Sequence, residues 1–108
     1  MRRRILVVED DRTLRQTLSF NLTREGYDVT TAADGETGLE AARNQQLDLI
    51  LLDVMLPGMS GVEVLRVLRR DGIGIPVIMV SAKGDEIEVD VSADGSRLEF
   101  RVLSKAQA

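Results

Sequence analysis

Short apolar segments recur along the first 82 residues of the chain and predict four β-strands. These strands are expected at residues 4–8, 27–32, 47–53 and 75–82, each bounded by polar or turn-forming residues. The third and fourth segments are apolar on both faces, as expected for strands at the centre of a parallel sheet. Pro76 is compatible with the fourth strand because it stands at its entrance.

Three amphipathic segments between these strands predict helices. The first has a leucine at every fourth position and ends at Gly26, a residue typical of helix C-termini. Asp34 caps the second helix, and Ser60 with Glu63 forms a capping box at the start of the third. The inner side of the third helix is expected to carry Val62, Leu65 and Leu68.

The repeated alternation of strand and helix predicts an α/β fold with a right-handed, doubly wound parallel sheet. In such sheets, ligands bind at the carboxyl ends of the strands, near the point where the strand order reverses. The predicted strand ends carry Glu9 and Asp10, then Asp53, then Ser81. We therefore expect three carboxylates and a hydroxyl from distant parts of the sequence to meet at one edge.

The pattern changes after residue 86 and predicts a C-terminal β-hairpin. Polar and apolar residues alternate over 87–91 and again over 97–103, and Asp94-Gly95 between them favours a type I′ turn. The whole chain, residues 1–108, is expected to form one domain: strand–helix units over 1–86, followed by the hairpin over 87–103.

Composition narrows the possible chemistry. Of the 108 residues, 44% are apolar and 30% are charged, and the net charge is −4, which disfavours non-specific nucleic-acid binding through a basic face. The absence of cysteine and histidine excludes thiolate nucleophiles, disulfides, histidine triads and histidine metal sites. Any bound metal must have oxygen ligands, and Mg²⁺ is the first candidate.

The N-terminal segment does not have the pattern of a targeting or membrane signal. It begins with basic residues, but its apolar run is shorter than the roughly 7–15 residues of a signal peptide or the about 20 of a membrane span. We therefore expect a cytoplasmic protein with no membrane partner.

The expected cluster of carboxylates favours a cation site. Carboxylates a few ångströms apart repel one another, so they either share protons or bind a cation. Mg²⁺ suits such a cluster because it takes few carboxylates and keeps positions open for water and phosphate oxygens. A carboxylate beside that ion can act as a nucleophile toward phosphorus, as in aspartyl-phosphate chemistry.

Three segments carry a resemblance to a known family: "ILVVEDDRTLR", "DLILLDVMLPGMSGVEVLRVLRR" and "IPVIMVSAKGDE". Over about residues 3–86 the chain resembles the receiver domain of bacterial two-component response regulators, most closely the receivers of winged-helix transcription factors. The resemblance implies a flavodoxin-like sheet of order 2-1-3-4, which here carries the three helices predicted above. It also implies the following roles: Asp53 as phosphoacceptor, Asp10, Asp53 and the Met55 backbone carbonyl as Mg²⁺ ligands, Glu9 bound to Mg²⁺ through water, and Ser81 as the hydroxyl that follows the phosphoryl group.

The tail departs from this family pattern. The hairpin stands where such receivers have a helix, a strand ending in Lys-Pro, and a last helix. Lys105 is separated from Asp53 along the sequence by about as many residues as the family's phosphate-pairing lysine is from its phosphoacceptor. The residue after it is Ala106 and not proline, so the alternative is that Lys105 is a solvated lysine of the tail. We expect residues 97–103 to lie beside the fourth strand with 87–91 outside them; the competing order reverses these two.

The implied function is that of a phosphoacceptor module in a two-component phosphorelay, with a histidine kinase or a small phosphodonor as partner and impaired output. The module is not expected to be an enzyme, beyond Mg²⁺-dependent self-phosphorylation and dephosphorylation. No DNA-binding domain follows in the sequence, so no direct nucleic-acid binding is expected. The alternative is an engineered or recombined chimera, built on a receiver fragment and without a signalling role.

A homodimer is also expected. One face of the predicted sheet has only the first helix to cover it, and the hairpin adds further apolar residues and an unpaired edge. A two-fold interface would bury both, at roughly 25 cal/mol per Å² of apolar surface.

Overall fold

The computed structural model describes residues 2–81 and 100–104, and this part of the chain contains five strands and three helices. In chain order they are β1 (Arg4–Val8), α1 (Arg12–Arg24), β2 (Asp28–Ala32), α2 (Gly35–Asn44), β3 (Leu49–Asp53), α3 (Gly61–Arg70), β4 (Val77–Ser81) and β5 (Phe100–Ser104). The four strands and three helices predicted for residues 1–86 are all present, with ends that differ from the prediction by a few residues.

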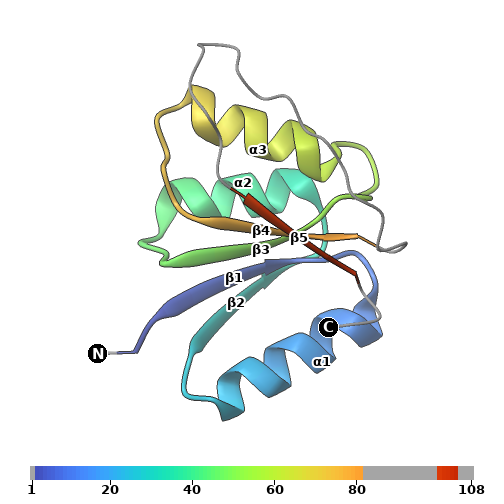
Figure 1. Cartoon of the computed structure of the whole chain (residues 1–108), viewed down its shortest axis with the longest axis vertical. Helices are drawn as coiled ribbons and strands as arrows, with labels where there is room; N and C mark the ends of the chain where they lie inside the picture. The colour runs from blue at the N-terminus through green and yellow to red at the C-terminus, as the bar shows by residue number, and fades with distance from the viewer. Residues whose placement is uncertain (1, 82–99, 105–108) are drawn as a thin grey trace.

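The strands form one sheet of order β2-β1-β3-β4-β5, and every neighbouring pair is parallel (Figure 1). The predicted doubly wound sheet of order 2-1-3-4 is therefore confirmed. The strand expected over 97–103 is present as β5, which lies beside β4 with Val77 opposite Phe100 and Ser81 opposite Ser104. The other predicted strand of the hairpin, 87–91, and its turn lie outside the described residues.

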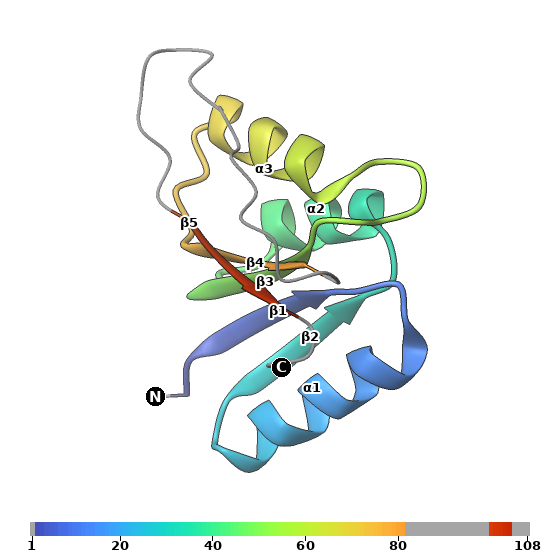
Figure 2. The same cartoon turned by 45° about the vertical axis from the view of Figure 1, so that its right-hand side comes forward.

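Helices cover the two faces of the sheet unequally. Figures 1 and 2 show α2 and α3 together on one face and α1 on the other. The main core lies between the sheet and the α2–α3 pair. From the strands it takes Leu6, Val8, Ala32, Ile50, Leu52, Val77 and Met79, and from these two helices Leu39, Ala42, Val64, Leu65 and Leu68.

On the opposite face, α1 has no fully buried residue. Its leucine stripe is only half-buried, and so are Leu51 and Ile78 on the strands of the same face. This agrees with the expectation that the α1 face is the less covered one. The homodimer inferred from it stays a prediction.

The helix ends follow the predicted capping chemistry. The Asp34 side chain accepts a hydrogen bond from the Thr37 amide, and Ser60 and Glu63 form the predicted capping box. Gly26 follows α1 with a φ of +98°, which favours glycine at this stop. α3 buries Leu65 and Leu68 as predicted, and Val62 packs half-buried against the core. Val64, which the sequence analysis did not name, is fully buried beside them.

Within the described residues, no helix combines the length and the apolar character needed to cross a membrane.

Candidate functional site

The end of β1 places two acidic residues at the carboxyl edge of the sheet. The Glu9 backbone N–H donates to the Ala32 carbonyl at 3.0 Å, which continues the pairing of β1 with β2 by one residue. The Glu9 side chain is buried, with 2% of its surface exposed, whereas Asp10 is exposed. Glu9 thus continues the buried run of β1, and Asp10 is the first exposed residue after it.

Asp53 is the last residue of β3, and only 1% of its surface is exposed. Its Oδ1 accepts a hydrogen bond from the Met55 backbone N–H at 3.0 Å. The next residue, Val54, donates its N–H to the Val80 carbonyl at 3.1 Å, so the chain stays attached to β4 just beyond the aspartate. These two bonds fix the backbone at Asp53 and the orientation of its carboxylate.

The N-terminus of α3 closes over this strand end. The Gly61 N–H donates to the Val54 carbonyl at 3.0 Å, which ties together the two ends of the connecting loop. A Cβ atom at position 61 would lie 2.1 Å from the Asp53 carbonyl oxygen, so only glycine permits this approach. The position of Asp53 therefore depends on the seating of α3 as well as on the sheet.

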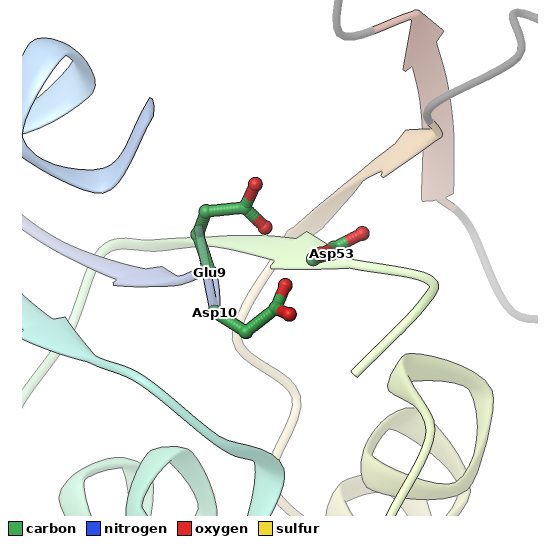
Figure 3. Close-up of side chains that lie close together, drawn as sticks. All are labelled: Glu9, Asp10 and Asp53. Carbon is green, nitrogen blue, oxygen red and sulfur yellow. The ribbon is translucent and has the colours of Figure 1, made fainter. Parts of the chain in front are cut away.

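One carboxylate oxygen from each of Glu9, Asp10 and Asp53 lies within 4.8 Å of the other two (Figure 3). The cluster lies between β1 and β3, where the strand order reverses, because β1 leads to β2 on one side and β3 lies on the other. Two oxygens on opposite sides of one Mg²⁺ would be about 4 Å apart. The spacing and the all-oxygen donor set therefore fit this ion.

The inner side of the cluster is apolar. A small cavity beneath Glu9 and Asp53 is lined otherwise by hydrophobic side chains, namely Val7, Val8, Leu14, Leu18, Leu51 and Val80. Apolar walls lower the local dielectric and strengthen the repulsion between neighbouring carboxylates. A divalent cation would relieve that repulsion, which makes the site selective for positive charge.

Of the candidate site residues, the structure brings the carboxylates of Glu9, Asp10 and Asp53 together. The backbone of Ser81 ends β4 at the same edge of the sheet as Asp53, as predicted. Lys105 lies outside the described residues, so its pairing role stays a prediction. Met55 contributes its N–H to Asp53, and its carbonyl as a metal ligand stays a prediction as well.

Sequence analysis missed one residue at this site, Arg15. Its guanidinium Nη1 donates to the Glu9 carbonyl at 2.9 Å and to the Asp10 carbonyl at 3.2 Å. No motif signals such a contact, because the partners are backbone atoms and their identity does not depend on the side chains at those positions.

The fold and the acidic edge together define a protein of the receiver class, and comparison with known proteins agrees. The chain belongs to the response regulator receiver domain family, whose model matches residues 5–97. Receiver domains are in general non-enzymatic signalling modules of two-component systems, and they bind Mg²⁺ at an acidic pocket. The match extends beyond residue 86, where the resemblance was expected to end. The predicted division of the domain into strand–helix units over 1–86 and a hairpin over 87–103 stays a prediction.

Several curated proteins are similar in sequence. The chain is 49% identical over 89 residues to the DNA-binding response regulator MtrA of Mycolicibacterium paratuberculosis, an alignment that spans 82% of this chain and 39% of MtrA. It is 46% identical over 88 residues to the alkaline phosphatase synthesis transcriptional regulatory protein PhoP of Bacillus subtilis, spanning 82% and 37%. The chain thus spans less than half the length of these relatives.

Solved structures show the same fold. The receiver domain of the Francisella response regulator 1452 matches with a TM-score of 0.82 and 29% identity, covering 96% of this chain and 84% of that one. The response regulator TrrA of Thermotoga maritima, solved in complex with Mg²⁺-BeF, matches with a TM-score of 0.78 and 34% identity, covering 93% and 85%.

The expectation of no nucleic-acid partner is wrong. It rested on the net charge of these 108 residues and on the absence of a further domain in the sequence. The relatives include proteins named DNA-binding response regulators and transcriptional regulators, and the chain matches only their receiver portion. The surface charge of a receiver therefore carries no information about DNA binding by the protein that contains it.

Proposed function

We propose that Asp53 accepts a phosphoryl group, from the phosphohistidine of a histidine kinase or from a small phosphoryl donor. The observation that carries this proposal is the convergence of three carboxylates at the switch point of the sheet, with Asp53 held at the end of β3. Membership of the receiver family supports the same role. The proposal includes a cytoplasmic location, where such a kinase presents its phosphohistidine.

In the proposed reaction, a carboxylate oxygen of Asp53 attacks phosphorus. The new P–O bond forms as the bond from phosphorus to the donor breaks, and the donor leaves with the electron pair of that bond. The Met55 N–H holds Oδ1 and so keeps the carboxylate plane constant as the nucleophile approaches. Burial of Asp53 limits the water that surrounds the acyl phosphate once it has formed.

The residues that would hold Mg²⁺ are Asp10 and Asp53, with the Met55 carbonyl as a further ligand and Glu9 acting through a water molecule. When bound, the ion neutralises charge on the transferring phosphoryl oxygens. Ser81 and Lys105 are proposed to contact the phosphoryl group after transfer. Self-phosphorylation from small donors, and hydrolysis of the aspartyl phosphate to the free carboxylate and inorganic phosphate, are the only chemical activities proposed for the domain.

The test is phosphorylation by acetyl phosphate in the presence of MgCl₂, followed by intact-protein mass spectrometry. The unmodified protein should gain one acid-stable, base-labile phosphoryl group, and Asp53→Ala should gain none while its circular dichroism spectrum stays native. Phosphate incorporation into folded Asp53→Ala would contradict the assignment.

Two adjacent aspartates provide a matched pair of variants for the metal. Asp10→Asn removes a proposed ligand and should weaken Mg²⁺ binding at least tenfold. Asp11→Asn removes a charge one residue away, outside the three-carboxylate cluster, and asparagine still caps α1. Equal loss of Mg²⁺ affinity in both variants would mean that only the overall negative charge matters, and that Asp10 is not a ligand.

A further inference from the structure

Arg15 makes an unusual set of contacts with the loop that carries the acidic pair. Its backbone N–H donates to the Asp11 carbonyl at 2.9 Å, as in any helix. Its guanidinium Nη1 donates to the two preceding carbonyls, those of Glu9 at 2.9 Å and Asp10 at 3.2 Å. One residue therefore binds three consecutive carbonyl groups between the end of β1 and the start of α1.

These bonds restrain the segment that presents the metal-site carboxylates. On its strand side the segment is held by the Glu9 N–H, which donates to Ala32 of β2. On its helix side the Asp11 side chain accepts from the Leu14 amide. Between these points the peptide carbonyls of Glu9 and Asp10 accept hydrogen bonds from the Arg15 guanidinium.

We propose that Arg15 is a positioning residue for the Mg²⁺ site: by binding the carbonyls of Glu9 and Asp10 it fixes the direction of their side chains toward Asp53. The proposal rests on the proposed Mg²⁺-binding function. Glu9 and Asp10 carry like charges near Asp53, and repulsion alone would drive a loose loop apart. A restrained loop keeps the carboxylates assembled before the ion arrives, so less ordering is required on binding.

The charge of Arg15 and its positioning role predict opposite changes in Mg²⁺ affinity when the guanidinium is removed. Arg15 is a cation near a cation site, so its charge by itself opposes Mg²⁺ binding. If charge dominates, removal of the guanidinium strengthens Mg²⁺ binding. If positioning dominates, removal weakens it, by about tenfold as is usual for residues that orient metal ligands.

The experiment is calorimetric titration of the purified protein with MgCl₂ alone. Arg15→Met removes the guanidinium but keeps an extended apolar side chain, and should bind Mg²⁺ about tenfold more weakly than the unmodified protein. Arg12→Met removes an exposed arginine from the same helix, and should change the affinity less than twofold. Arg15→Lys keeps the charge and a donor, and should recover part of the lost affinity.

A second readout reports on the loop directly. In the metal-free protein, amide hydrogen exchange at Asp10 and Asp11 should quicken in Arg15→Met while exchange in β3 is unchanged. Folded Arg15→Met that binds Mg²⁺ as tightly as the unmodified protein, or more tightly, would overturn the proposal. Absence of Mg²⁺ binding by the unmodified protein would instead refute the proposed function, so the two failures are distinguishable.

Discussion

Substitution of Gly61 by alanine tests how closely α3 is seated against the proposed phosphoacceptor strand. The added Cβ would lie 2.1 Å from the Asp53 carbonyl oxygen, 2.9 Å from its carbonyl carbon and 3.0 Å from the Val54 Cα. All three are backbone atoms, so no change of rotamer relieves the clash. Ordinary C···O contacts are about 3.3–3.6 Å long, so the two segments must separate by more than about 1 Å.

The nature of the contact sets the expected loss in the free energy of unfolding of Gly61→Ala. Overpacking a core typically costs about 1–3 kcal/mol, and a collision with backbone belongs at the upper end of that range. Alanine gains up to about 1 kcal/mol over glycine within a helix, which offsets part of the cost. We expect a net loss of about 2 kcal/mol in the free energy of unfolding and a Tm lower by about 10 °C.

Unfolding in urea can be followed by far-UV circular dichroism, since the chain contains no tryptophan for fluorescence. Substitutions at two other glycines serve as controls. Gly74→Ala meets no atom within 4 Å and should leave stability within about 0.5 kcal/mol. For Gly38→Ala the nearest atoms belong to the side chain of Val8, which can shift more easily than backbone, so this variant should fall between the other two. Gly61→Ala that unfolds at the same urea concentration as Gly74→Ala would refute the argument from close approach.

Two further predictions concern the helix caps. Ser60→Ala removes the side chain that accepts from the Glu63 amide, and should cost about 1 kcal/mol in chemical denaturation; an unchanged midpoint would mean that the capping box adds nothing. The hydrogen bond from the Thr37 backbone N–H lowers the pKa of Asp34, with a smaller contribution from the Thr37 side chain. The ionised Asp34 cap therefore stabilises the protein at pH values above the ordinary carboxyl pKa. This stabilisation is lost as the pH falls through the lowered pKa. Asp34→Asn should therefore lose less stability than the unmodified protein between neutral and acidic pH, and parallel pH profiles of Tm would contradict this.

The sequence was sufficient to predict the framework because its local and long-range signals agree. β3 and β4 are apolar on both faces and therefore need helices above and below, which only a doubly wound arrangement provides. The caps at Asp34 and Ser60 then mark where two of those helices begin. The degree of burial was less predictable: Val62 and Val64 are chemically identical, and the helix phase decides that Val64 is fully buried and Val62 only half-buried.

The site was predictable only in part, for a different physical reason. Acidic side chains at strand ends are visible in the sequence, and parallel topology brings them together at one edge. Backbone contacts have no such signature: neither the hydrogen bonds from Arg15 to the loop carbonyls nor the close approach of Gly61 to Asp53 depends on the identity of the partner side chain. Such contacts appear only when the elements are placed in space.

These backbone contacts explain how the acidic cluster persists in a small domain. Three carboxylates within 4.8 Å of one another, with apolar side chains beneath two of them, oppose the compact state by their mutual repulsion. The segments that carry them are held by bonds that do not use the carboxylates: Glu9 to β2 through its N–H, the loop carbonyls to Arg15, and Val54 to both β4 and α3. The sheet and the helix ends thus resist the repulsion between the three carboxylates.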